Sequence, residues 1–158
     1  MSVRASAEAD RVTAERPARR VNALRSASFT TLVLLLIQYG LGMYTNLYVN
    51  VPSGDKGHGF GEAISNGPAA LSVHAVLGLL LILGGIGLVV QAVLARYWTV
   101  LAAAVIALVT IIGAAFSGAG FVNKGGPASA SMTMAILAGV AMLCYGTVLY
   151  LLSSPRQR

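Results

Sequence analysis

One histidine lies inside a long apolar segment and is the residue best suited to chemistry. It is His74, in the run Ser72-Val-His-Ala-Val-Leu-Gly78. An ionisable group within a membrane costs free energy unless it is paired or used, so it is a functional candidate. A neutral imidazole is also a good axial ligand for haem iron, which makes His74 a candidate metal and cofactor ligand. Alternatively, His74 could interact with a quinone, carry a proton, or make only a structural hydrogen bond.

A second ligand is suggested by comparing the two halves of the chain. An alignment on the Ala-x-Leu that follows both residues places Met134 opposite His74, whereas an alignment on the two Gly-Pro-Ala motifs places Thr133 there. His74 with Met134 or Met132 could hold a b-type haem as a His/Met pair near the outer surface. Two His74 side chains could also meet across a homodimer, and methionines in apolar helices usually serve only in packing.

Polar side chains on neighbouring segments could instead hold His74. Gln38 lies in the first apolar run and could donate to His74 or to a cofactor, while Ser72 and Thr133 are other polar partners. Such side chains hydrogen-bond across helices in lipid. Gln38 is therefore a candidate cofactor-binding residue and, equally, a candidate tie between helices.

A glycine-rich loop carries the remaining candidate ligands, Asp55, His58 and Glu62. Carboxylate and imidazole groups suit several metals. Their spacing matches no rigid site, however, and the glycines around them make the segment flexible. A solvated loop is the simpler interpretation.

Several reaction types are excluded by what the chain lacks. No carboxylate pair lies inside an apolar segment for general acid–base work, and no glycine-rich loop leads to Lys-Ser/Thr to bind phosphate. The acidic residues lie only before residue 16 and in the loop, which rules out a Ser-His-Asp arrangement in the apolar segments. Cys144 is the single cysteine, so an intramolecular disulfide cannot form. No catalytic residue is predicted.

The segments that position His74 are apolar and long. Of the 158 residues 56% are hydrophobic and 10% are charged, against about 25% charged in a soluble domain. Each apolar run exceeds the roughly 20 residues that cross a bilayer, and in lipid each must be helical to satisfy its backbone. The runs cover about 28–48, 68–94, 97–119 and 128–152. We therefore predict an all-α membrane protein with a four-helix domain over 28–152.

The basic residues predict the orientation of these helices. All of them except Lys56 and Lys124 lie before the first run, at Arg96, or after the fourth run. The positive-inside rule then places both termini in the cytoplasm. Residues 1–27 are polar and aperiodic, which predicts a disordered basic tail, and 153–158 form a short tail. The usage of alanine, glycine and arginine suggests a bacterium. The net charge of +6 therefore marks topology or contact with anionic lipid rather than nucleic-acid binding.

The order of the runs predicts an up-down bundle. The turn at Arg96 is very short, so the second and third helices should be antiparallel neighbours. The end of the first run, Gly40–Asn50, is similar to the end of the third, Gly113–Asn123, which favours two repeated hairpins. Small residues on the helices would let the backbones approach closely.

Two short motifs resemble a known family. Gln38-Tyr-Gly-Leu-Gly42 closes the first run, and His74 precedes Leu77-Gly78 in the second. Together they resemble the N-terminal half of bacterial haem A synthase, a family of two four-helix halves with histidine haem ligands near the outer helix ends. The resemblance, over about 32–83, implies a half-size fold with His74 as the first ligand.

This chain departs from that family at several positions. Leu71 and Ser72 stand where an acidic residue is expected, and Ala75 replaces an arginine. The fourth run has Thr133 or Met134 in place of a histidine, and four of eight helices are present. Synthase activity is therefore not expected.

Two functions follow as hypotheses. The first is a small bacterial inner-membrane protein that binds b-type haem through His74 and assists respiratory electron transfer or haem handling, as a homodimer or within a larger complex. The second is a non-enzymatic accessory subunit of a larger membrane complex without a cofactor, in which His74 only ties helices together. A transporter with a site between the repeats is a third hypothesis.

Overall fold

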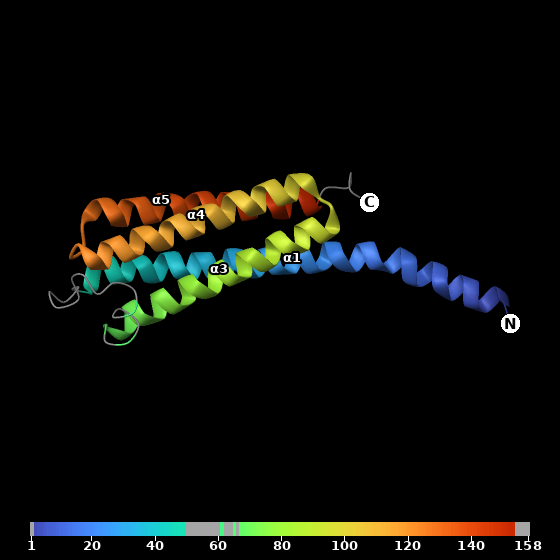
Figure 1. The fold of residues 1–158 in the computed structure, drawn as a ribbon, viewed down its shortest axis with the longest axis horizontal. Helices are drawn as coiled ribbons and strands as arrows, with labels where there is room; N and C mark the ends of the chain where they lie inside the picture. The colour runs from blue at the N-terminus through green and yellow to red at the C-terminus, as the bar shows by residue number, and fades with distance from the viewer. Residues whose placement is uncertain (1, 50–60, 62–64, 66, 154–158) are drawn as a thin grey trace.

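Four helices form an antiparallel up-down bundle in the computed structural model, which describes residues 2–49, 61, 65 and 67–153, with side chains from residue 19 onward. The helices are α1 (Ser2–Tyr48), α3 (Ala69–Ala95), α4 (Trp98–Asn123) and α5 (Ala128–Ser153). They form a ring in which α1 and α4 each contact both α3 and α5. The start of α1 and the end of α5 lie at the same end of the bundle (Figure 1).

Each helix contains a segment long and apolar enough to cross a membrane. These segments are Arg19–Tyr48, Ala69–Ala95, Trp98–Asn123 and Ala128–Ser153, of 26 to 30 residues. Large apolar side chains face outward, and those of Trp98 and Phe116 are both 75% exposed. In water such a surface would be unfavourable, whereas in lipid it meets a solvent of its own polarity. The prediction of four membrane-length helices is confirmed.

The first helix begins much earlier than the apolar run that it contains. α1 starts at Ser2, so the helix also covers residues 2–27, where the sequence suggested a disordered tail. Alanine and arginine are the commonest residues of that segment and rank among the better helix formers. The absence of an apolar face thus did not prevent a helical backbone.

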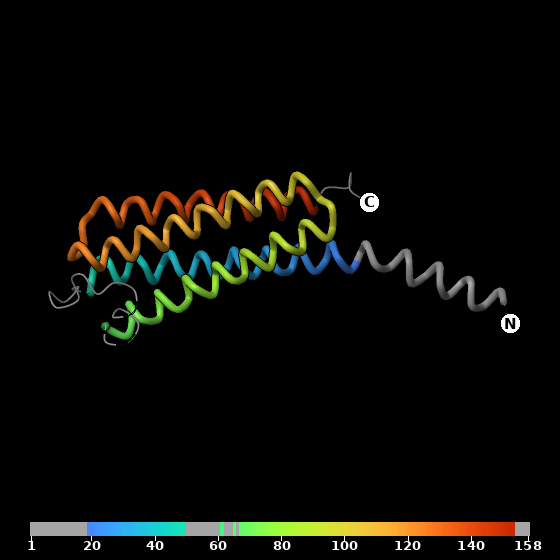
Figure 2. Tube along the Cα trace, viewed as in Figure 1, coloured from blue at the N-terminus to red at the C-terminus, as the bar shows by residue number. Residues whose placement is uncertain are grey.

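The two turns within the described chain are tight, and both use left-handed backbone conformations. Arg96 has φ 59° and ψ 30° at the end of α3, and its N–H donates to the carbonyls of Ala92 and Val93. Between α4 and α5, Gly125 and Gly126 take φ values of 74° and 83°. Figure 2 shows these turns returning each helix alongside its predecessor. The predicted tight turn at Arg96 is confirmed.

Small residues bring the helices together in the main core. Ala92, Ala107 and Ala141 are fully buried between helices, beside the fully buried ring of Tyr145. A separate small cluster, in which Leu71 packs with Phe121 and Val122, lies at the end of the bundle away from the start of α1 and the end of α5. Close packing at alanine and glycine is the usual source of helix association in lipid, because burial from water is not available.

Candidate functional site

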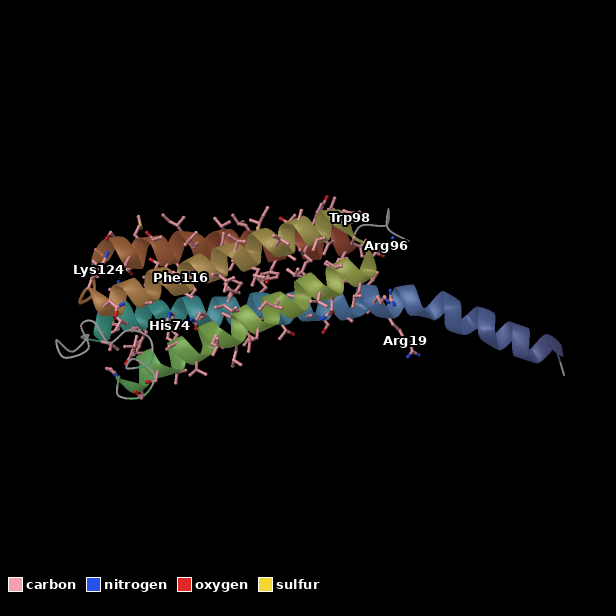
Figure 3. The ribbon with its side chains drawn as sticks, viewed as in Figure 1. Arg19, His74, Arg96, Trp98, Phe116 and Lys124 are labelled. Carbon is pink, nitrogen blue, oxygen red and sulfur yellow. The ribbon has the colours of Figure 1, made fainter. Side chains whose placement is uncertain are left out.

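His74 is held by Gln38 across the contact between α3 and α1. The side-chain nitrogen of Gln38 lies 3.3 Å from His74 Nε2 and donates to the backbone carbonyl of His74 at 2.9 Å. Figure 3 shows His74 toward the end of the bundle that carries Lys124, far from Arg96. One amide group thus contacts both the ring and the backbone of the same residue.

The chemistry of the amide assigns the protons of the imidazole. The NH2 group of Gln38 can only donate, so His74 Nε2 must accept. The ring is then neutral, and Nδ1 carries its hydrogen. This tautomer is inferred from the hydrogen-bond pattern, as ring protons generally are. A doubly protonated ring would place an N–H against the amide hydrogens and lose the contact.

Two glycines make room for this pair. A Cβ atom at Gly42 of α1 would lie 2.9 Å from His74 Cε1, and a Cβ atom at Gly78 of α3 would lie 3.3 Å from Gln38 Nε2. Each glycine follows the polar residue of its own helix by four positions, which is one helical turn. The imidazole therefore lies over the glycine of α1 and the amide over the glycine of α3, in a reciprocal arrangement.

Each partner keeps one buried polar atom without a hydrogen bond in the described part of the chain. These atoms are His74 Nδ1, a donor, and Gln38 Oε1, an acceptor. An unsatisfied buried group costs about 1–3 kcal/mol. On one side the two side chains are thus hydrogen-bonded to each other. On the other side, His74 Nδ1 can still donate and Gln38 Oε1 can still accept a hydrogen bond.

Met134, the predicted second ligand, is directed toward a different helix. Its sulfur lies 3.2 Å from where a Cβ atom would stand at Gly118 of α4. It packs against the cluster that contains Leu71, one turn from His74. Met134 therefore lies in the neighbourhood of the histidine, but its sulfur packs against α4, whereas the imidazole packs against α1.

The other predicted partners of His74 are engaged locally. The Thr133 hydroxyl donates to the Ser129 carbonyl within its own helix at 2.9 Å, and Met132 is exposed on the surface. The Ser72 hydroxyl lies 3.4 Å from the Gly67 carbonyl oxygen. Of the three predicted hydrogen-bond partners, Gln38 is the one that the structure brings to His74.

As placed, these residues do not present a pair of axial haem ligands. Nε2, one of the two ring nitrogens that can ligate a metal, accepts from Gln38, and the edge of the ring rests on the backbone of α1 at Gly42. Ligation through Nε2 would require this contact to open. In the described part of the chain no group of three His, Cys, Asp or Glu residues could hold a metal ion. The loop candidates Asp55, His58 and Glu62 lie outside the described residues.

Sequence reasoning missed the role of Gly42 and Gly78 in this site. The available signal was a polar residue followed by glycine four positions later in both helices, Gln38 with Gly42 and His74 with Gly78. A second tie was also missed, in which the Ser117 hydroxyl of α4 donates to the Ala130 carbonyl of α5 at 3.0 Å. Such ties are visible only once the rotation of each helix is known.

Comparison with known proteins adds no relative. No protein-family model matches this chain, and no curated protein or solved structure is similar enough to count as a match. The resemblance to haem A synthase therefore rests on the two short motifs alone. Four of their residues, Gln38, Gly42, His74 and Gly78, have an explanation in helix packing that involves no haem.

Proposed function

We propose that this protein is a non-enzymatic accessory subunit of a larger membrane complex, in which the Gln38–His74 pair fastens α1 to α3. The proposal rests on one observation, namely that Gln38 already occupies both hydrogen-bond acceptors of His74. The ring nitrogen and the backbone carbonyl of His74 both accept from Gln38, and both side chains lie on glycines. A polar side chain that is hydrogen-bonded in this way ties two helices together in lipid.

An outward-facing glycine pair on α3 supports assembly with another membrane helix. Gly84 and Gly87 have no atom within 4 Å of an added Cβ, and the neighbouring Leu83 and Ile86 are exposed. Glycines on a lipid-facing surface let a second helix approach closely. A larger complex, rather than a second copy of this chain, is the partner that we propose.

We further propose that the chain resides in a bacterial cytoplasmic membrane with both termini in the cytoplasm. Of the labelled cations, Arg19 and Arg96 lie at one end of the bundle and Lys124 at the other (Figure 3). Arg20 and Arg25 belong to the same basic end as Arg19, because they follow it within two turns of α1. The positive-inside rule assigns that end to the cytoplasm.

We also propose that the two hairpins arose by duplication of a single unit. In each hairpin a long side chain of the second helix packs against a glycine of the first helix. These pairs are His74 with Gly42 and Met134 with Gly118. The sequence alignment pairs Gly42 with Ala115 rather than with Gly118, so the two glycine positions differ by one helical turn. A duplication followed by local rotation would account for both facts.

Haem binding is the second candidate function, and one observation favours it. His74 Nδ1 and Gln38 Oε1 are buried at one site without partners, so the pair has capacity for a ligand. A bound b-type haem would supply one-electron transfer. In that case the imidazole of His74 would leave Gln38 to act as ligand, and Gln38 and Met134 would line the cofactor.

One pair of measurements separates the two candidates. The visible spectrum of the protein purified in detergent from haem-replete cells should show no Soret band, whether oxidised or reduced. Native gel electrophoresis in mild detergent should show the chain in an assembly of higher mass. Gly84→Leu should dissociate that assembly, while Gly139→Leu, at another glycine with open space around it, should not. A Soret band that disappears in His74→Ala would instead establish the haem function.

A further inference from the structure

A groove opens between α1 and α5 at the basic end of the bundle, far from His74. Its cavity volume is about 590 Å³, within the roughly 300–1,000 Å³ of typical ligand sites. From α1 it is lined by Asn22, Arg25, Ser26 and Phe29, and from α5 by Leu149, Tyr150 and Ser153. Nothing in the proposed accessory function uses this groove.

The lining changes from polar to apolar along the bundle axis. On α1 the polar residues Asn22, Arg25 and Ser26 precede Phe29, and on the antiparallel α5 Leu149 precedes Ser153. The polar residues of both helices therefore lie at the basic end, and the apolar ones lie deeper in the membrane-length segment. From Asn22 to Phe29 the axial rise is about 10 Å at 1.5 Å per residue. This gradient is that of a phospholipid, with its headgroup above its acyl chains.

Arg25 supplies the charge that selects the headgroup. No hydrogen bond or ion pair to Arg25 occurs in the described part of the chain, and no acidic residue lines the groove. A guanidinium binds a phosphate through two parallel hydrogen bonds. By contrast, the neighbouring Arg20 is already engaged, because it donates to the Leu94 carbonyl at the end of α3 at 3.1 Å.

We propose that this groove binds one anionic phospholipid, with the phosphate on Arg25 and an acyl chain along Phe29 and Leu149. Tyr150 lies between these two regions, as aromatic residues do at the level of the headgroups. Ser26, Asn22 and Ser153 provide hydrogen-bonding groups for the glycerol part. The bound lipid joins α1 to α5 on the side of the bundle opposite to the α1–α3 contact.

The test is the thermal stability of the purified full-length chain in detergent as lipid is added. Phosphatidylglycerol should raise the midpoint of unfolding saturably, and phosphatidylcholine should not. Arg25→Gln should weaken the apparent affinity about fivefold, as expected for loss of one cation at about 1 kcal/mol. Arg25→Lys keeps the charge but not the two parallel hydrogen bonds, so it should lose less affinity than Arg25→Gln and more than the control. Arg96→Gln is the matched control, because it removes the same charge at the same end outside the groove.

Two further arms keep the proposal falsifiable. Ser153→Trp, at the last residue of α5, should block the groove without disturbing the core and should abolish the shift. Glycerol phosphate, which has the headgroup chemistry without acyl chains, should give no shift at matched concentration. An equal shift with glycerol phosphate would identify a soluble phosphate ligand instead. Equal losses in Arg25→Gln and Arg96→Gln would reveal only diffuse charge attraction, and either result overturns the lipid site.

Discussion

The amide of Gln38 donates to the backbone carbonyl of His74 at 2.9 Å and faces its ring nitrogen at 3.3 Å. The two side chains cross between antiparallel helices, and each lies over a glycine four residues beyond the other partner. Gln38, Gly42, His74 and Gly78 thus form one packing unit. Its consequences can be measured one residue at a time.

Adding a methyl group at Gly42 should destabilise the bundle. In Gly42→Ala the new Cβ would stand 2.9 Å from His74 Cε1, so the imidazole must move and give up Gln38. Overpacking of this kind costs about 1–3 kcal/mol, which exceeds the gain of about 1 kcal/mol for replacing glycine in a helix. We expect a net loss in the free energy of unfolding, measured by denaturant titration in detergent micelles.

Gly40→Ala is the matched control, because no atom lies within 4 Å of its added Cβ. It should leave stability unchanged or raise it by up to about 1 kcal/mol. Gly118→Ala should cost less than Gly42→Ala, since the atom that it meets is the end of the flexible Met134 side chain. Equal changes in the free energy of unfolding for the Gly40 and Gly42 variants would show that the imidazole does not pack against Gly42.

Removing the hydroxyl of Tyr145 should not harm the protein. Its oxygen is buried without a hydrogen-bond partner in the described chain, and an unsatisfied buried group costs free energy. Tyr145→Phe should therefore leave the free energy of unfolding unchanged or raise it by up to about 1 kcal/mol. Tyr150→Phe, at an exposed tyrosine, serves as control. A loss of more than about 1 kcal/mol in Tyr145→Phe would mean that the hydroxyl has a partner.

Arg96→Gly should stabilise the turn between α3 and α4. Arg96 has a φ of 59°, and this left-handed conformation costs an L-residue about 1–2 kcal/mol, whereas glycine is preferred there. We expect the free energy of unfolding to rise by about 1 kcal/mol. Arg96→Gln removes the same charge without relieving the backbone, so it should give no gain. If both variants gain equally, charge rather than conformation limits the turn.

The sequence predicted the helices well because lipid constrains their length and composition. The expected starts and ends agree within about two residues, except that α1 already begins at Ser2 and α4 continues to Asn123 rather than stopping near Ala119. Gly125 and Gly126, which adopt positive φ, follow the end of this helix. Glycine inside an apolar helix is tolerated, and it often lies where two helices pack closely.

The partner of His74 was harder to predict, because it depends on the rotation of each helix about its axis. A shift of one residue turns a side chain by about 100°, and the two possible alignments of the halves differed by one residue. Gln38 was among the expected partners, whereas Met134 was expected opposite His74 and seats on Gly118 instead. The glycines that fix the rotation of the helices were recognised as small residues. That each one packs against a particular side chain was not predicted.

A double-mutant cycle on Gln38 and His74 tests the central claim most directly. The free energy of unfolding in micelles would be measured for Gln38→Leu, His74→Leu and the double variant. Because each single change leaves a buried polar partner unpaired, we predict that the double variant loses less than the sum of the single losses, with a coupling of about 0.6 kcal/mol and at most about 1.7 kcal/mol. Losses that add to within about 0.3 kcal/mol would contradict the claim that this pair fastens α1 to α3.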